Sequence, residues 1–407
     1  MKFQHIQILN VSFRFDEKQT LIGRLATKNG RIYFEYDAQF LKSNTQISPY
    51  RLPLQNGLIQ NTDTTFDGLF GVFNDSLPDG WGKLLVDRAL RARNVAFESL
   101  TPLDRLSFVG NRGMGALAYS PEQHFEAPSA ITVDLQSLAK EINEVISGTA
   151  SEVIEKLQVF GGSSAGARPK ILVGYNRSSN SLISGVDELS TDYEAWIIKF
   201  PSSSDPEDIA QIEQAYAIMA KLAQIQMSET QLFTSGMKQF FGTKRFDCEN
   251  GKRLHVHTAA GLLHSSHRYP SLDYRDLMSL TWRLTEDFRE MEKVFRLCCF
   301  NVLAHNRDDH SKNFSFLMDQ KGEWKFAPAY DLTFSFGPGG EQSTTVMGEG
   351  KNPTMKHLFE LADEFQIKKP SIVINEVRES INQWPKIADN SGVTSESKKL
   401  IAKHLQG

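Results

Sequence analysis

The residues best suited to chemistry lie in the segment HNRDDHSKNFSFLMD, residues 305–319. Asp308 and Asn313 are five residues apart, the interval between a catalytic aspartate and a metal-binding asparagine in one class of phosphoryl-transfer loop. That chemistry needs a carboxylate to accept a hydrogen bond from the attacking hydroxyl, and a neutral oxygen ligand nearby to hold a hard divalent cation. The spacing therefore predicts Asp308 as a base and Asn313 as a Mg²⁺ ligand.

The histidines of the same segment suggest a different metal. His305, His310 and the doubled Asp308-Asp309 invite a metal-site interpretation. Zinc is the weaker choice, because the two histidines are five residues apart and no cysteine or glutamate completes a set of ligands.

A second acidic residue follows in FAPAYDLTFS, residues 326–335. By itself Asp331 reads as a surface or capping residue. Its position changes this interpretation, because it lies eighteen residues after Asn313 with a hairpin-like stretch between them. Asp331 is therefore predicted to bind Mg²⁺ together with Asn313, as the metal-binding aspartate does after the catalytic loop of kinases.

A strand-like run, AWIIKFP at 195–201, contains one charged residue, Lys199. Alternation places Lys199 on the face opposite Ile198 and Phe200, and a charge in so apolar a strand is costly unless it is paired. Nucleotide phosphates and an acid on the following helix would pair it, and Glu213 is the acid we select. The alternatives are a snorkelling lysine at a sheet edge and a solvated glutamate.

The run FGGSSAGARPK, residues 160–170, is rich in small residues and precedes a strand. Its backbone N–H groups could cradle phosphates, although a plain linker is an equal alternative. It is not a Walker loop, because Ala167 occupies the position of the lysine. Its serines, Ser163 and Ser164, could also be phosphorylated.

The surrounding elements indicate an α+β fold. Runs at 21–27 and 31–36 flank Asn29-Gly30, which suits a hairpin turn. A helix is expected after Asp75, Ser76 or Asp79, and another from 132 to 160. Short strands surround a helix at about 206–224, and helices dominate from 273 onward. In 290–303 the apolar residues share one helical face; they are Met291, Val294, Phe295, Cys298 and Val302.

Composition sets limits on the class of protein. The 407 residues carry a net charge of −4, which argues against a basic nucleic-acid binder as a whole. Cys248, Cys298 and Cys299 fit neither a disulfide framework nor zinc spacing, and the adjacent pair is expected to be buried. No signal peptide and no apolar run of about 20 residues is evident. We therefore expect a cytoplasmic protein that makes no membrane contact.

Six segments together resemble the HipA family of toxins from toxin–antitoxin systems, in the family's order. They are FNDSLPDGWGKLLVDR (73–88), GGSSAGARPK (161–170), WIIKFP (196–201), KRFD (244–247), NRDDHSKNFSF (306–316) and PAYDL (328–332). The resemblance implies a HipA-like N-terminal subdomain over 1–125 and a kinase-like core. This core would have a small β-rich nucleotide-binding lobe over 126–248 and a larger helical lobe over 249–407.

The resemblance also implies roles for individual residues of an ATP- and Mg²⁺-dependent serine/threonine kinase. Asp308 looks like the catalytic base, Lys199 like the ATP-phosphate lysine, and Asn313 and Asp331 like the Mg²⁺ ligands. The other implied ATP contacts are Ala165, Gly166, Ala167, Arg168, Pro169, Lys170, Lys244, Arg245, Phe246, His310, Ser311, Lys312 and Tyr330. A serine ahead of the ATP-facing loop is autophosphorylated in the family; its position here is that of Ser163, or of its neighbour Ser164.

Partners follow from the same resemblance. They are a protein substrate, such as an aminoacyl-tRNA synthetase, and a HipB-like helix-turn-helix antitoxin through which DNA is contacted indirectly. The sequence departs from some members at Lys244, where they have glutamate, and in RLHVHTAAGLLH (253–264), where its histidines replace polar or acidic residues. The alternatives are a corepressor acting with the antitoxin, and a small-molecule phosphotransferase, which shares the Asp-to-Asn interval but lacks the GGSSAGARPK loop.

Overall fold

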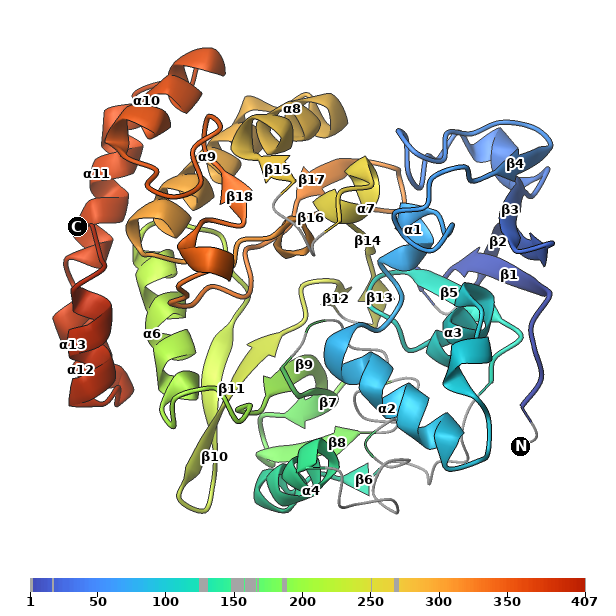
Figure 1. Ribbon diagram of the computed structural model, residues 1–407, viewed down its shortest axis with the longest axis horizontal. Helices are drawn as coiled ribbons and strands as arrows, with labels where there is room; N and C mark the ends of the chain where they lie inside the picture. The colour runs from blue at the N-terminus through green and yellow to red at the C-terminus, as the bar shows by residue number, and fades with distance from the viewer. Residues whose placement is uncertain are drawn as a thin grey trace. The chain divides into compact units, whose positions relative to one another are not determined.

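The computed structural model describes residues 3–16, 18–123, 131–147, 157, 166, 168–184, 189–249, 251–266 and 271–406. Contacts between Cα atoms divide the chain into two units. Unit 1 consists of Met1–Ser203, Phe233–His257 and Asp319–Gly322, and unit 2 of Ser204–Leu232, Thr258–Met318 and Glu323–Gly407. Figure 1 labels the helices and strands of both.

Unit 1 begins with a five-stranded antiparallel sheet built around the predicted hairpin. Lys28 lies opposite Arg31, and the two residues between them, Asn29 and Gly30, have φ angles of 52° and 71°. This turn needs positive φ at both positions, which asparagine and glycine adopt most readily. The strand order is β4-β3-β2-β1-β5. The bounds are β1 Ile8–Phe13, β2 Thr20–Lys28, β3 Arg31–Tyr36, β4 Leu58–Gln60 and β5 Leu117–Ser120.

Three α-helices lie between β4 and β5 along the chain: α1 Gly71–Asn74, α2 Gly80–Arg91 and α3 Pro102–Val109. The helix predicted to follow the acidic cluster at 75–79 is α2, with Asp79 at its N-cap. Helix α3 begins with a reciprocal cap, in which the Thr101 side chain accepts the N–H of Asp104 and the Asp104 carboxylate accepts the N–H of Thr101.

The second sheet of unit 1 has six strands in the order β10-β11-β9-β7-β8-β6. Its central strands, β7 and β9, are antiparallel. Strand β9 corresponds to the strand-like run predicted at 195–201, and β7 is the strand expected after the run at 160–170. The bounds are β6 Ile131–Thr132, β7 Lys170–Asn176, β8 Ser181–Ser184, β9 Glu194–Lys199, β10 Thr230–Ser235 and β11 Lys238–Lys244. A short hairpin, β12 Cys248–Glu249 and β13 Lys252–Arg253, follows.

A single hydrophobic cluster joins this second sheet to α2 and to α4 (Leu135–Ser147). Trp196 of β9 is fully buried in it, with ring centroids 5.8 Å from Tyr175 and 5.5 Å from Phe233. Such aromatic contacts fix side-chain geometry as well as bury area. The core therefore fixes β9, the strand that carries Lys199. Helix α4 covers part of the helix predicted from 132 to 160, whose remainder falls largely outside the described residues.

Unit 2 is mainly helical. The predicted face of α9 (Phe288–Leu303) is buried, and α8 and α11 pack on this helix while α12 packs on α6 (Figure 1). The remaining bounds are α6 Ile209–Leu222, α7 Ala259–Leu263, α8 Tyr274–Thr285, α10 Met355–Glu364, α11 Pro370–Ile381, α12 Trp384–Ser391 and α13 Ser395–Ala402. A large cluster of apolar side chains from these helices forms the core of the unit.

A hairpin separates the loop at 305–313 from Asp331, as the sequence predicts. Its strands, β16 (Ser315–Met318) and β17 (Trp324–Phe326), are antiparallel, with Phe316 opposite Phe326. The hairpin is tied to α9, because the Phe326 N–H donates to Oε2 of Glu290 at 2.8 Å. The short strands β15 (Leu272–Asp273) and β18 (Thr344–Thr345) pair in parallel.

The predicted α+β class is confirmed, with the sheets concentrated in unit 1 and the helices in unit 2. The predicted domain boundaries at 125 and 248 stay predictions. Within the described ranges, the structure contains no helix that is both long and apolar enough to span a membrane.

Candidate active site

The two adjacent carboxylates at 308 and 309 have different surroundings. Asp308 is exposed, whereas Asp309 is 1% exposed. Asp309 accepts hydrogen bonds from the Tyr274 hydroxyl at 2.8 Å, from Nε2 of Gln342 at 3.0 Å and from the N–H of Thr344 at 3.1 Å. Asp309 therefore holds the loop in place, and Asp308 is the carboxylate that an acceptor group can reach.

The pKa of the buried Asp309 is shifted by its surroundings. Burial raises its pKa to about 7, against the opposing effect of the hydrogen bonds from Gln342, Tyr274 and Thr344. Tyr274 is itself buried and accepts a hydrogen bond from Nδ2 of Asn301 at 2.9 Å. This role of Asp309 could not be predicted from the sequence, because its partners are 33 to 35 residues away in the chain.

A hydrogen bond from the Asn313 side chain to the backbone of Asp308 fixes the orientation of the Asn313 amide. Its Nδ2 donates to the main-chain carbonyl of Asp308 at 2.7 Å, and its N–H donates to the carbonyl of His310 at 2.8 Å. The amide is held by its nitrogen, so its oxygen points to the other side of Cγ. That oxygen is the atom that could bind a hard cation.

Asp331 lies in a constrained stretch of backbone. Its φ is 59°, an uncommon conformation for a residue with a side chain and one that is often found at functional sites. The preceding Tyr330 donates its hydroxyl to the carbonyl of Lys312 at 2.6 Å, and the Ala329 N–H donates to the carbonyl of Gln226 at 2.8 Å. The Tyr330 hydroxyl thus ties the Asp331 segment to the loop that carries Asn313.

The segment after Asp331 also braces the loop. The Ser335 N–H donates to the carbonyl of His305 at 3.1 Å, and Nε2 of Gln342 donates to the carbonyl of Asn306 at 2.9 Å. The Ser343 N–H donates to the carbonyl of Arg307 at 3.0 Å. Three successive carbonyls before Asp308 are therefore held by residues 335–343.

The other predicted residues of this loop differ in exposure. Ser311 is buried, and its hydroxyl donates to the carbonyl of Ser265 at 3.2 Å. His310 and Lys312 are half-buried. The Ser311 side chain therefore has a structural partner, so an ATP contact from this residue would come from its main chain.

In unit 1, two lysines lie side by side on the second sheet. Lys199 of β9 is the register partner of Lys170 of β7, and both are half-buried. The Lys199 ammonium also lies 5.5 Å from the centroid of the Phe241 ring. The two side chains place positive charge on this face of the sheet, where an anionic group could bind.

Gly166 is attached to the start of α2. Its N–H donates to Oδ1 of Asp79, and its carbonyl accepts the Trp81 N–H at 3.1 Å. Its φ is 99°, a backbone conformation that residues with a side chain rarely adopt, so glycine suits this position. Asp79 was expected only to cap a helix; its side chain makes no cap bond and instead fixes this loop.

Arg168 is half-buried, and the carbonyl of the buried Pro169 accepts the Phe200 N–H at 2.8 Å. The other predicted residues of this loop, Ser163, Ser164, Ala165 and Ala167, lie outside the described residues.

Lys244 and Arg245, which the resemblance implies as ATP contacts, direct their side chains to protein partners. Nζ of Lys244 lies 2.7 Å from Oε1 of Glu194. Burial alone would raise the pKa of Glu194, but hydrogen bonds from Lys244, Arg177 and Trp196 hold it at about 2. Any ATP contact by Lys244 would therefore come from its main chain.

Arg245 is buried in a network of its own. Its guanidinium contacts both carboxylate oxygens of Asp247, at 3.0 and 2.7 Å, and Asp247 also accepts the Gly115 N–H at 2.6 Å. Burial alone would raise the pKa of Asp247, but Arg245 and the Gly115 N–H hold it below its usual range. The network anchors the loop before β5 to the segment after β11, which carries Arg245 and the half-buried Phe246.

Glu213, the acid chosen to pair with Lys199, is buried on α6 in unit 2, whereas Lys199 belongs to unit 1. Their pairing stays a prediction.

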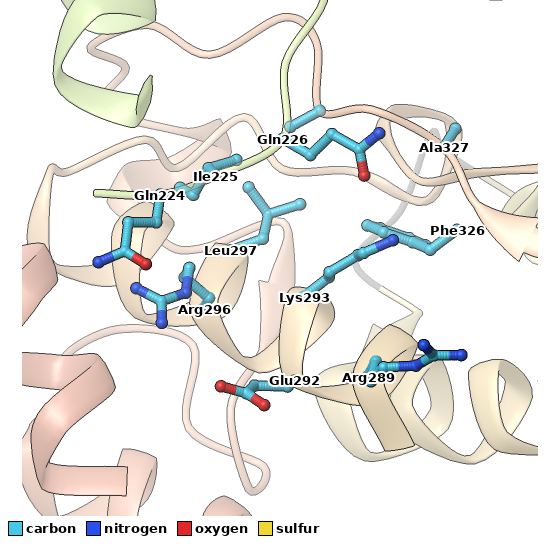
Figure 2. Close-up of a pocket in the computed structure, with 11 residues that line it drawn as sticks. Gln224, Ile225, Gln226, Arg289, Glu292, Lys293, Arg296, Leu297, Phe326 and Ala327 are labelled. Carbon is cyan, nitrogen blue, oxygen red and sulfur yellow. The ribbon is translucent and has the colours of Figure 1, made fainter. Parts of the chain in front are cut away.

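Figure 2 shows a pocket in unit 2 with a volume of about 120 Å³, bordered by α9. It contains neither Asp308, Asn313 nor Asp331. The three cations at its wall are paired, Lys293 with Glu290, Arg296 with Glu376 and Arg289 with Asp287, each at 2.6 Å. The pocket therefore lacks the uncompensated positive charge that a nucleotide site needs.

The residues present fit Mg²⁺ better than zinc. In the part of the chain that the structure describes, no three His, Cys, Asp or Glu side chains gather as a metal site would require. Mg²⁺ needs only one or two protein ligands, because waters and phosphate oxygens complete its shell. The oxygens of Asn313 and Asp331 match that requirement.

The fold and these two loops define a two-part protein of the HipA type. Residues 16–120 match the HipA N-terminal domain, and residues 162–385 match the HipA-like C-terminal domain. The second match alone covers more than half of the chain, which therefore belongs to the HipA family.

Two other proteins resemble this chain. A chain in the structure of the Shewanella oneidensis MR-1 toxin–antitoxin system HipA, HipB and operator DNA superimposes with a TM-score of 0.69. That match has 18% identity and covers 97% of this chain and 94% of the other. The Sinorhizobium fredii protein described as "Putative kinase Y4dM" is 24% identical over 212 residues, 47% of this chain. The chain matches 50% of the length of that relative.

Proposed function

We propose that the protein is an ATP- and Mg²⁺-dependent serine/threonine protein kinase, and the toxin of a toxin–antitoxin module. The observation that carries the proposal is the contrast between Asp308 and Asp309. Asp308 is exposed, while Asp309 is buried and fully engaged with Tyr274, Gln342 and Thr344. A carboxylate on a rigid loop, with an asparagine amide fixed to its main chain, suits the activation of an acceptor hydroxyl.

The chemistry assigns one task to each of the residues in unit 2. Asp308 accepts the proton of the acceptor hydroxyl as the hydroxyl oxygen bonds to the γ-phosphorus and the bond from that phosphorus to the ADP oxygen breaks. Asn313 and Asp331 would hold Mg²⁺, which neutralises phosphate charge when it is bound. Asp309 acts on Asp308 only through the backbone that it fixes.

The residues of unit 1 bind ATP in this proposal. Lys199 and Lys170 present two positive charges on one face of the sheet, and Gly166 is fixed by Asp79 for a main-chain phosphate contact. Lys244, Arg245 and Phe246 would contact adenine through the main chain. This assignment is supported by the protein partners that the Lys244 and Arg245 side chains already have.

The partners proposed are a HipB-like helix-turn-helix antitoxin and, through it, operator DNA. This is supported by the TM-score of 0.69 to a chain whose structure contains HipA, HipB and operator DNA. The same match favours a second candidate function, that of a corepressor acting with the antitoxin. The two candidates differ in whether the protein by itself consumes ATP.

The test is transfer of labelled γ-phosphate from ATP into a cell lysate by the purified protein, with the labelled species separated into proteins and small molecules. We expect label in protein. The Asp308→Asn variant should lower the rate by about 10²–10⁴-fold and leave ATP binding largely intact, because a general base acts mainly in the transition state. Asp363→Asn, at an exposed position on α10, is the matched control.

Three results would contradict this proposal. Near-normal turnover by the Asp308→Asn variant would remove Asp308 from the mechanism. Label found only in small molecules would favour a small-molecule phosphotransferase, and no ATP consumption at all would favour the corepressor.

A further inference from the structure

An exposed aromatic ring lies beside the loop that carries Asp308. Phe336 is 51% exposed, and its ring centroid is 4.9 Å from that of Phe334, 5.3 Å from His404 and 6.1 Å from His305. The other three rings also contact one another, and His305 is buried. Phe336 is therefore the outer member of a four-ring cluster. The other three rings pack against it, and one side of its ring is exposed to solvent.

The backbone on both sides of Phe336 is fixed to the same loop. The Ser335 N–H donates to the His305 carbonyl at 3.1 Å, and Asn306 and Ser335 form a parallel bridge. Gly337 has a φ of 71°, and a Cβ there would lie 2.7 Å from Cβ of Arg307. Only glycine permits this approach, so Phe336 is held at a defined position against residues 305–307.

Phe336 is within reach of a bound substrate segment. Asp308 is two residues beyond Asn306, and Phe336 is one residue beyond Ser335, so their Cα atoms are at most roughly 16 Å apart along bridged, extended chain. An extended peptide covers about 3.3 Å per residue, so that interval corresponds to about five residues. A side chain near the acceptor serine or threonine could therefore contact Phe336 while the hydroxyl is at Asp308.

The chemistry at this position favours an apolar side chain. Burial, with the nearby Arg307 and His404, lowers the pKa of His305 to about 4, so that ring is uncharged at neutral pH. Arg307 is countered by Glu341, whose negative charge acts on it. A rigid, half-exposed aromatic ring with little net charge around it is the kind of group that binds an apolar partner side chain.

We propose that Phe336 is a specificity-determining residue of the kinase. It binds an apolar side chain of the protein substrate, such as leucine or phenylalanine, within about five residues of the phosphorylated hydroxyl. This inference rests on the proposed function and adds the class of substrate sequence. A substrate side chain is the group that would bind here, because the Phe336 ring adjoins the loop of Asp308 through the Asn306–Ser335 bridge.

The test uses a set of serine-centred peptides in which each of the five positions on either side carries leucine, phenylalanine, glycine, glutamate or lysine. We expect wild-type protein to prefer leucine or phenylalanine at one position by about tenfold or more in kcat/KM, as apolar contacts commonly give. Phe336→Ala should abolish this preference without changing the KM for ATP, and Phe336→Leu should retain part of it.

Phe288→Ala provides the matched control, because Phe288 is a similarly exposed aromatic residue (55%) at the start of α9. If free peptides are not accepted, the protein labelled in the lysate replaces them, with each apolar residue near its phosphosite changed to glutamate. An unchanged preference in Phe336→Ala, with its melting temperature retained, would overturn the inference, as would the absence of any apolar preference in the wild type. A wild-type protein that labels nothing would instead reject the proposed function itself.

Discussion

Asp308 and Asp309 carry the same side chain at adjacent positions, and the fold alone gives them different properties. Asp308 faces outward without strong burial, while Asp309 is enclosed by a tyrosine, a glutamine and a main-chain N–H. A buried carboxylate resists ionisation, so Asp309 is the member of the pair that should respond to pH near neutrality.

This pH response can be measured as stability. An aspartate in an unfolded chain has a pKa of about 3.9, and the folded pKa of Asp309 is about 7. The folded state therefore binds this proton more tightly than the unfolded state. The stabilisation is fully present below about pH 4 and is lost as the pH rises through about 7.

We therefore expect the free energy of unfolding of the wild type, relative to that of Asp309→Asn, to fall between pH 4 and pH 7.5. Urea unfolding at a series of pH values measures it, and contributions from all other groups cancel in the difference. Parallel profiles for the two proteins would show that Asp309 does not titrate in this range.

The sequence located Asp308, Asn313 and Asp331 because their interval and order are local. It did not reveal the anchoring role of Asp309, whose three partners come from α8 and from the segment after Asp331. Spacing identifies which residues could do chemistry, whereas burial, which separates the two carboxylates, depends on contacts between distant segments.

At the scale of elements, the start of α2 acts as a support for the loop before β7. The Asp79 side chain makes no capping hydrogen bond to its own helix and instead accepts the N–H of Gly166, 87 residues away. The hairpin β2–β3 and helix α9 could be predicted, because turn residues and apolar periodicity are local signals. The contact between Asp79 and Gly166 could not, because two separate motifs meet only in the fold.

We expect Asp79→Ala to weaken ATP binding. A hydrogen bond to a charged group contributes about 1.5–3 kcal/mol, so its loss should raise the KM for ATP by roughly tenfold or more and change kcat little. Steady-state kinetics at varied ATP measures both constants. Asp79→Asn keeps an oxygen acceptor and should restore most of the affinity; equal defects in the two variants would show that this hydrogen bond is not the cause.

The network of Arg245 and Asp247 should matter for stability. Asp247→Ala leaves the buried Arg245 guanidinium without its carboxylate, and breaking such a pair costs about 3–5 kcal/mol. Urea unfolding should show this loss, and the double variant Arg245→Met/Asp247→Leu should recover most of it. Glu360→Ala, in an exposed ion pair with Lys356, is the control and should cost under about 1 kcal/mol. A loss as small as that of the control would mean that solvent reaches Arg245.

At the scale of the whole molecule, the proposed kinase takes residues from both units, and its regulation is expected to involve the loop before β7. We propose that active protein phosphorylates Ser163, or failing that Ser164. A phosphate adds about −1.5 to −2 charges, which would repel the phosphates of ATP and be attracted by Arg168 and Lys170. ATP affinity should therefore fall as the loop is modified.

Mass spectrometry after incubation with Mg²⁺ and ATP should find phosphate in the peptide from 161 to 170. Ser163→Ala/Ser164→Ala protein should keep its ATP affinity during the same incubation, while Asp308→Asn protein should stay unmodified. If active protein labels another substrate and this peptide carries no phosphate, the switch is refuted and the kinase is not.

The family resemblance covered most of the chain, so the class of fold could be expected from the sequence at this scale too. The side-chain contacts inside unit 1 could not be expected. Trp196 with Tyr175 and Phe233, and Asp247 with Arg245 and Gly115, join segments that are distant in the sequence and meet only once the chain is folded.

The three cysteines have a practical consequence for spectroscopy. Cys298 and Cys299 are fully buried, burial raises the pKa of both thiols, and burial also raises the pKa of Cys248 to about 11. Thiolate is the reactive form, so the native protein should take up maleimide dyes slowly. Cysteines introduced at the exposed Met237 in unit 1 and Ile372 in unit 2 could then be labelled with a donor and an acceptor fluorophore, with little labelling of the native cysteines. Energy transfer between the two fluorophores would follow the separation of the two units as nucleotide is added.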